Sequence, residues 1–313
     1  MTLRGFLAIT LLLAITSPAL VRAQARVQRL APGEHHATIN GVRFWYKVAG
    51  KGHLLVVQAP GWGIGSLYLQ NGLAPLEKHF RLVFYDPRGS GNSSRPEDEA
   101  RMSTAGMVND LDRLRQYWGL GSLNLIGHSH GGAIALDYGV RYSARVRNLV
   151  LVDAEISGYD DRGAIKKELD TRRNDKRFSE AIAEVDRNTM PKTDEEFRGI
   201  LARMLPLYFY DPFQSVPILQ KNSLNLPSAW ACRTNVAADR RNPINVSNEL
   251  GRVRARTLVL VGREDWICPV SDAERIHADV DGSKLVIFEK CGHFPWIESP
   301  QDFFDSVTSF IGQ

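Results

Sequence analysis

The stretch that most constrains this chain is NLIGHSHGGAIALDYG, residues 124–139, in which a short apolar strand turns through glycines into a helix. Gly127 to Gly131 matches the pattern G-x-S-x-G, and the apolar residues after Gly132 have helical spacing. So tight a turn strains the backbone of its serine, and the positions two residues to either side must lack a side chain. Gly127 and Gly131 meet that need, so the sequence predicts a nucleophile elbow at Ser129.

The rest of the chain alternates strands with helices, which predicts an α/β fold with a doubly wound, mainly parallel sheet and right-handed crossovers. Residues 155–250 differ, because they are rich in charge and helix formers and lack a convincing apolar strand. We therefore expect a core of residues 26–154 and 251–313 and an inserted helical cap of residues 155–250. Strands are expected at residues 36–40, 42–48, 54–59, 82–85, 124–126, 146–152, 257–261 and 285–288, and helices at 66–79, 104–118 and from 132 onward.

The first 25 residues have the pattern of a secretory signal peptide. Arg4 precedes an apolar run from Phe6 to Ile15, and small residues around Ala23 and Ala25 offer cleavage sites. The apolar run is short for spanning a bilayer, so cleavage is favoured over an uncleaved membrane anchor. The expected location is therefore outside the cell or in the periplasm, with no stable membrane span after cleavage.

Composition limits the classes of partner. The 313 residues carry 39 basic and 35 acidic side chains, a net charge of +4, with 43% hydrophobic residues. This balance is typical of a globular enzyme and gives no electrostatic case for binding nucleic acid. A small molecule or a short peptide is the expected substrate, and the oligomeric state cannot be predicted.

Unusual polar or glycine-rich groups follow nearly every predicted strand. In parallel sheets, ligands bind at the carboxyl ends of the strands, so these groups are expected to converge at one edge. The groups are Pro60-Gly61-Trp62-Gly63, Asp86-Pro87-Arg88-Gly89, Ser129, Asp153, Asp265 and His293.

With these motifs the sequence resembles the α/β-hydrolase fold family over nearly all of the mature chain. The order serine, acid, histidine in Ser129, Asp265 and His293 is that of the family. The proline iminopeptidase branch is the most similar one, although this chain has His130 where that branch has tryptophan, and APGWG where it has HGGPG. The motifs are PGWG, DPRGSGNSSRP, GHSHG, GREDWICP and CGHFPWIESP.

The chemistry of acyl transfer assigns roles to these residues. Ser129 needs a base to become a nucleophile, and His293 is the candidate. The other ring nitrogen of His293 needs a carboxylate, for which Asp265 is the first choice and Asp153 or Glu155 the alternative. The oxyanion of the tetrahedral intermediate needs two backbone donors, expected from the amides of Trp62 and His130.

Other features have simpler interpretations. His128 and His130 lack a third ligand at suitable spacing, so neither a metal nor a cofactor is expected. Arg88 is expected to brace its loop, and Cys291 to fill apolar space rather than act as a nucleophile. Cys268 and Cys291 lie on loops expected to be neighbours, which leads to the hypothesis of a disulfide between them.

The predicted cap carries an apolar, aromatic run, suited either to a hydrophobic substrate or to the cap's own core. Asp194, Glu195 and Glu196 are either a solvated charge run or a site for a substrate ammonium group. Three functions remain open: a serine hydrolase of small esters, lactones or amides, a proline iminopeptidase-like aminopeptidase, and a non-catalytic binding protein. The apolar run comprises Phe197, Leu201, Met204, Leu205, Leu207, Tyr208, Phe209, Tyr210 and Phe213.

Overall fold

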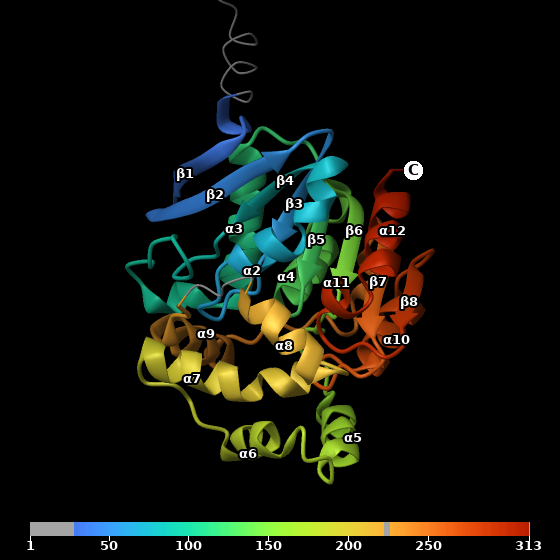
Figure 1. Cartoon of the computed structure of the whole chain (residues 1–313). Coiled ribbons are helices and arrows are strands. Elements are labelled where there is room, and N and C mark those ends of the chain that lie inside the picture. The colour runs from blue at the N-terminus through green and yellow to red at the C-terminus, as the bar shows by residue number, and fades with distance from the viewer. Residues whose placement is uncertain (1–27, 222–225, 313) are drawn as a thin grey trace, which may run out of the picture.

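A computed structural model describes residues 28–221 and 226–312, which contain an eight-stranded sheet in the order β1-β2-β4-β3-β5-β6-β7-β8 (Figure 1). The pairs β1–β2 and β2–β4 are antiparallel and all the others are parallel, so the predicted mainly parallel sheet is confirmed. The signal peptide predicted at residues 1–25 lies outside the described residues. The strands are β1 (Gly33–Ile39), β2 (Val42–Gly50), β3 (His53–Gln58), β4 (Phe80–Tyr85), β5 (Leu123–His128), β6 (Val146–Val152), β7 (Arg256–Gly262) and β8 (Lys284–Phe288).

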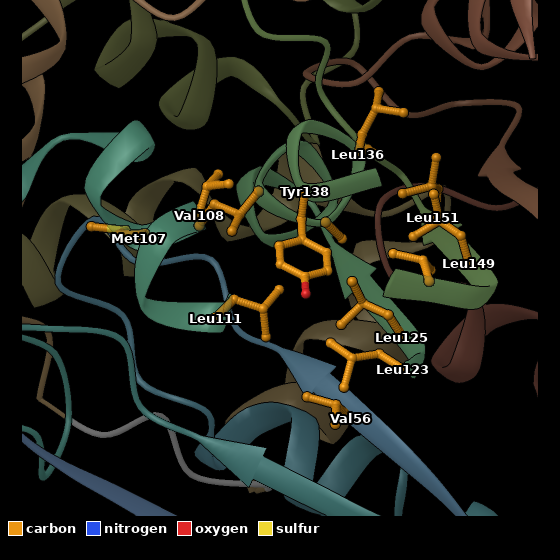
Figure 2. Packing of buried hydrophobic residues seen from close by; sticks show 14 of the residues in the cluster. Val56, Met107, Val108, Leu111, Leu123, Leu125, Leu136, Tyr138, Leu149 and Leu151 are labelled. Atoms are coloured by element: carbon orange, nitrogen blue, oxygen red, sulfur yellow. The ribbon is translucent and has the colours of Figure 1, made fainter. Parts of the chain in front are cut away.

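The central strands are apolar at nearly every position because both faces of the sheet are covered. Side chains of a strand alternate between its faces, so Leu55 and Val57 enter one hydrophobic cluster while Val56 enters the other. Helices α3 (Thr104–Tyr117), α4 (His130–Arg141) and α10 (Val270–Asp279) pack on the Val56 side, part of which is drawn in Figure 2. The opposite face is covered by α2 (Leu67–Gly72), α11 (Pro295–Glu298) and α12 (Pro300–Ile311).

The helix predicted over residues 66–79 is divided in the structure. Helix α2 ends at Gly72, and a 3₁₀ turn follows from Ala74 to Lys78. Pro75 has no backbone N–H to continue the α-helical hydrogen bonds and disfavours helical geometry at the residue before it. Helix α4 also begins at His130, earlier than the expected Gly132, so the nucleophile of the predicted elbow directly precedes the helix.

A group of helices is inserted between β6 and β7, as the sequence predicts. They gather beyond the carboxyl ends of the parallel strands, where Figure 1 shows α7, α8 and α9 nearest the sheet and α5 and α6 farther out. None of the helices in the described part of the chain is long and apolar enough to cross a membrane. The inserted helices are α5 (Arg162–Arg172), α6 (Ser179–Arg187), α7 (Asp194–Met204), α8 (Pro212–Lys221) and α9 (Ala229–Arg241).

Helix α4, which follows Ser129, carries a buried acid, Asp137. Its Oδ2 accepts a hydrogen bond from Ser157 Oγ at 2.9 Å, and its Oδ1 has no hydrogen-bond partner among the described residues. Burial raises the pKa of Asp137 from an ordinary 3.8 to about 7. The folded protein therefore keeps a proton that the unfolded chain releases at lower pH.

This raised pKa predicts a specific pH dependence for Asp137→Asn. Between the two pKa values, 3.8 and about 7, the folded state binds more protons, so wild-type stability falls as the pH rises through that range. Asparagine stays neutral throughout, so the variant should melt several degrees above wild type near pH 8 and close to it near pH 4. Thermal unfolding at both pH values measures the difference. An equal shift at both values would contradict the assigned protonation.

Candidate active site

The turn at Ser129 has the strained geometry that its sequence predicts. Ser129 lies between β5 and α4 with φ 58° and ψ −132°, and its amide donates to the carbonyl of Val152 at 3.0 Å. A Cβ at Gly127 would lie 2.3 Å from the Gly131 carbonyl oxygen, and one at Gly131 would lie 2.5 Å from that of Gln58. Both glycines are therefore required by close backbone approach, and together they hold the serine at the carboxyl edge of the sheet.

His293 and Asp265, which are distant in sequence, are in direct contact. Nδ1 of His293 lies 2.7 Å from Oδ2 of Asp265, and the two side chains are 3% and 0% exposed. The other oxygen of Asp265 accepts the amides of Ile267 at 3.0 Å and Cys268 at 3.2 Å. The carboxylate is thus fixed by its own loop and oriented toward the histidine.

The backbone of His293 is held from two sides. Its amide donates to the carbonyl of Tyr208 in the inserted segment at 2.8 Å, and its carbonyl accepts from Nε2 of His128 at 2.8 Å. Because a carbonyl can only accept, His128 carries its proton on Nε2, and its Nδ1 accepts from the Tyr68 hydroxyl at 2.8 Å. Burial, followed by the nearby His293, holds the pKa of His128 well below its usual value, so this ring is neutral. His128 therefore positions the backbone of His293, whereas its sequence context suggested only a possible metal ligand.

Asp153, the alternative acid, has a different environment. It is completely buried, and its Oδ1 accepts the amide of Gly262 at 2.9 Å. Burial and the neighbouring charge of Asp265 raise the pKa of Asp153 well above its usual range. Asp153 thus bonds the end of β7, whereas Asp265 is the carboxyl group that contacts His293.

The loop after β3 has a sharply turned backbone. Gly61, Trp62 and Gly63 have φ values of 79°, 54° and 81°, and the amide of Ile64 donates to the Gly61 carbonyl at 2.8 Å. The Trp62 ring lies beside that of His130, with 5.4 Å between ring centroids, and both residues line one cavity with Ser129. We call residues 60–64 the oxyanion loop, after the role expected for the Trp62 amide.

The following loop is braced by Arg88, as predicted. Nε of Arg88 donates to Oδ2 of Asp110 on α3 at 2.5 Å, and both side chains are buried. Asp86, at the start of the same loop, accepts the amide and the hydroxyl of Ser66, each at 2.7 Å. These contacts hold the loops after β3 and β4 together.

A metal is a poor fit to the polar cluster at this site. Among the described residues, Asp265, Cys268 and His293 have potential ligand atoms within 4.8 Å of one another. Asp265 and His293 already share a hydrogen bond, and burial raises the pKa of Cys268 well above its usual value. A protonated thiol is a weak ligand, so these groups suit proton transfer better than metal coordination.

The hypothesised disulfide between Cys268 and Cys291 is wrong, because both residues and Cys232 are free, buried thiols. Cys291 belongs to the hydrophobic cluster on the α12 side of the sheet, where its Sγ contacts the Gly292 carbonyl at 3.4 Å. Cys268 faces Asp265 instead. The two cysteines lie on the loops that carry Asp265 and His293, but they do not form a bond with each other.

A cavity of about 390 Å³ opens between the sheet edge and the inserted helices, and Ser129 and His293 both line it. The apolar run of the inserted segment divides between this cavity and other places. Phe209 and Leu207 are completely buried, Tyr210 and Phe213 are exposed at 38% and 75%, and the remainder line the cavity. The cavity-lining members are Phe197, Leu201, Met204, Leu205 and Tyr208.

Of the acidic residues 194–196, one alternative for an ammonium site, two accept backbone amides near the starts of helices α9 and α7. Oδ1 of Asp194 accepts the Ala229 amide at 2.7 Å, and Oε2 of Glu196 accepts the Lys192 amide at 2.8 Å. The carboxylates that line the cavity are Glu155 and Glu184. Glu184 is paired with Arg203 at 2.7 Å, whereas Glu155 stands close to His130 and His293, which oppose the rise in its pKa caused by burial.

Comparisons with known proteins identify the family of this chain. A family model described as alpha/beta hydrolase fold matches residues 55–300. The chain is 27% identical over 265 residues to the proline iminopeptidase PfmaB of Pestalotiopsis fici, covering 83% of this chain and 92% of the relative. It is 26% identical to the proline iminopeptidase of Saccharolobus solfataricus over 312 residues, covering 90% and 92% of the two chains.

Solved structures share the fold at lower identity. The esterase RhEst1 from Rhodococcus superposes with a TM-score of 0.69 and 22% identity, covering 90% of this chain and 99% of that one. The enol-lactonase from Burkholderia xenovorans LB400 superposes with a TM-score of 0.67 and 18% identity, covering 89% and 100%.

The free cysteines predict the outcome of a thiol titration. Burial raises the pKa of Cys232 to about 11 and holds those of Cys268 and Cys291 well above their usual value, so an aromatic disulfide reagent should react slowly with the native protein. After denaturation without reductant, all three thiols in the chain should react. A count of one thiol under those conditions would show that a disulfide does form.

Proposed function

The chain belongs to the α/β-hydrolase fold family, and from that premise we propose that it is an exported serine hydrolase that cleaves a small ester, lactone or amide through an acyl-enzyme. One observation carries the proposal: the hydrogen bond of 2.7 Å from Asp265 to His293, which lines one cavity together with Ser129. A buried acid, a histidine and a strained serine at one sheet edge are the parts that acyl transfer needs.

In the proposed reaction, the Ser129 hydroxyl attacks the substrate carbonyl while Nε2 of His293 takes its proton. Asp265 holds the proton of His293 on Nδ1 and stabilises the imidazolium that forms. The tetrahedral intermediate then collapses, and His293 returns the proton to the leaving oxygen or nitrogen. Water releases the acyl group by the same steps, with His293 again acting as the base.

The negative oxygen of the intermediate would be bound by the backbone amides of Trp62 and His130. His130 directly follows the nucleophile, at the first position of α4, where the positive end of the helix dipole also favours an anion. The left-handed backbone at Gly61, Trp62 and Gly63 and the place of Trp62 beside Ser129 in the cavity lining support this role.

The two buried acids make a matched test of the proposed triad. Asp265→Asn should lower kcat about 10⁴-fold, because an amide favours the wrong tautomer of His293 and cannot stabilise its charge. Asp153→Asn should keep kcat within a few-fold of wild type, since an asparagine oxygen can also accept the Gly262 amide and burial already raises the pKa of this carboxyl group. Turnover of a p-nitrophenyl ester measures both variants. Near-normal turnover in Asp265→Asn would overturn the assignment of the acid.

A proline iminopeptidase-like activity is the second candidate. The cavity holds Glu155 close to His130 and His293, and a carboxylate at that place would bind the ammonium group of an amino-terminal residue. The names of the fungal and archaeal relatives favour the same activity. A substrate with an apolar body and one amine would fit both this acid and the surrounding apolar wall.

Parallel release assays separate the two activities. Short p-nitrophenyl esters and proline p-nitroanilide are compared on the purified protein, with Ser129→Ala as the blank. We expect ester release that disappears in the blank, because a serine nucleophile is required for both substrates. Anilide release would establish the aminopeptidase, and binding without release of either product would favour a non-catalytic member of the fold.

Glu155→Gln refines the aminopeptidase result. If Glu155 holds an ammonium group, the variant should raise KM for the prolyl anilide about ten-fold or more and leave KM for neutral esters within about two-fold of wild type. Glu196→Gln is the matched control, since Glu196 is bonded to the Lys192 amide and is not part of the cavity wall. Equal effects on both substrates would exclude an ammonium site at Glu155.

Export is proposed from the first 25 residues alone. Cleavage after Ala23 or Ala25 would release the hydrolase into the periplasm or the medium, where a small-molecule or short-peptide substrate would reach it. The proposed reaction requires no cofactor, and the modest net charge supports no nucleic-acid partner.

A further inference from the structure

The ring of His130 connects the oxyanion loop to the inserted segment. Its Nδ1 bonds the carbonyl of Pro60, the first residue of the oxyanion loop, and its Nε2 lies 2.9 Å from Oγ1 of Thr104 at the start of α3. Thr104 is in turn bonded twice to Asp239 on α9, through its amide at 2.8 Å and its hydroxyl at 2.7 Å. Four elements distant in sequence are thus joined by one chain of hydrogen bonds.

The direction of these bonds determines where the protons are. The Pro60 carbonyl can only accept, so Nδ1 of His130 carries a proton. The single hydroxyl proton of Thr104 is donated to Oδ2 of Asp239, which also accepts from Asn235 Nδ2 at 2.7 Å. The Thr104 oxygen is therefore left to accept from Nε2 of His130. With Asp239 as a carboxylate that accepts the Thr104 hydroxyl, every bond of the chain is made only when both ring nitrogens carry protons, that is, when His130 is an imidazolium.

Helix α9 contacts the oxyanion loop at a second point. The amide of Ser228, the N-cap of α9, donates to the Gly63 carbonyl at 2.9 Å. A Cβ at Gly63 would lie 2.1 Å from the Ser228 carbonyl oxygen, so the two backbones are in closest contact there. The oxyanion loop is thus held by α9 directly at one end and through Thr104 and His130 at the other.

We propose that His130 is an imidazolium held by Asp239 through Thr104, and that it positions the oxyanion loop so that helix α9 controls the alignment of the two oxyanion donors. The backbone amide of His130 is expected to be one oxyanion donor. The side chain of the same residue would then hold the loop that carries the other donor, the Trp62 amide. His130 acts on the loop and not on the substrate, so its side chain is a positioning group.

The surroundings of the ring are consistent with a positive charge. Asp239 faces it from α9 through Thr104, Glu155 faces it from the segment after β6, and the Trp62 ring lies at 5.4 Å from it on the oxyanion loop. Two carboxyl groups and an aromatic ring all favour a cation at this position. The charge would also lie next to the oxyanion that forms on the substrate.

This inference rests on the proposed hydrolase reaction, and Thr104→Val tests it with Thr104→Ser as the matched rescue. Valine has the shape of threonine and keeps the amide bond to Asp239, but it removes the hydroxyl acceptor that Nε2 requires. We expect kcat for a p-nitrophenyl ester to fall about ten-fold with KM within about two-fold, and serine to restore it. Thr234→Val is the control, because the Thr234 hydroxyl bonds only the backbone of its own helix α9.

Nuclear magnetic resonance of protein labelled with ¹⁵N at histidine and tryptophan, near neutral pH, gives a readout that does not need activity. The inference predicts two protonated ring nitrogens for His130 in wild type and Thr104→Ser, and one in Thr104→Val and Asp239→Asn. The Trp62 amide resonance should move in the same two variants, because the oxyanion loop is released.

The outcomes separate the two proposals. Absence of turnover of both the ester and the prolyl anilide in wild type, together with a doubly protonated His130, would count against the hydrolase reaction and leave the positioning chain intact. A singly protonated His130 in wild type, or an unchanged kcat and Trp62 resonance in folded Thr104→Val, would overturn the inference. Thermal unfolding of each variant establishes that it is folded.

Discussion

The turn between β5 and α4 is the constraint on which the site depends. The chain must reverse within a few residues while β5 stays paired with β3 and β6, and this is possible only because Gly127 and Gly131 allow backbone atoms to touch. The strain is concentrated at Ser129, whose positive φ costs about 1–3 kcal/mol. The covered sheet compensates for that cost by burying apolar side chains on both faces, and the serine is held at the edge where the other polar groups also lie.

Two buried acids lie close together at the carboxyl edge of the sheet. Asp265 accepts two amides of its own loop and contacts the His293 ring. Asp153 accepts the Gly262 amide, and burial and the neighbouring Asp265 raise its pKa well above the usual range. The two carboxyl groups therefore differ in role, since one contacts the histidine and the other supports the strand end.

The inserted segment is part of the site as well as its cover. The carbonyl of Tyr208 holds the His293 amide, and helix α9 contacts the oxyanion loop at Gly63. Changes in this segment would consequently alter the alignment of the catalytic groups along with the shape of the cavity. The same helices therefore line the cavity and contact the loops that carry His293 and Trp62.

The sequence by itself determined the parallel sheet, the elbow at Ser129 and the loops after β7 and β8, because period, glycine spacing and chain order are local or sequential signals. It did not reveal that residues 66–79 are two helical pieces, although Pro75 is a local signal for that division. Only the tertiary structure decided that Cys268 and Cys291 are free thiols, which groups bond His128, His130 and Asp153, and where Glu155 lies in the cavity. These properties depend on burial and on contacts between segments up to 165 residues apart. The neighbours of a residue along the chain carry no information about its burial or about such contacts.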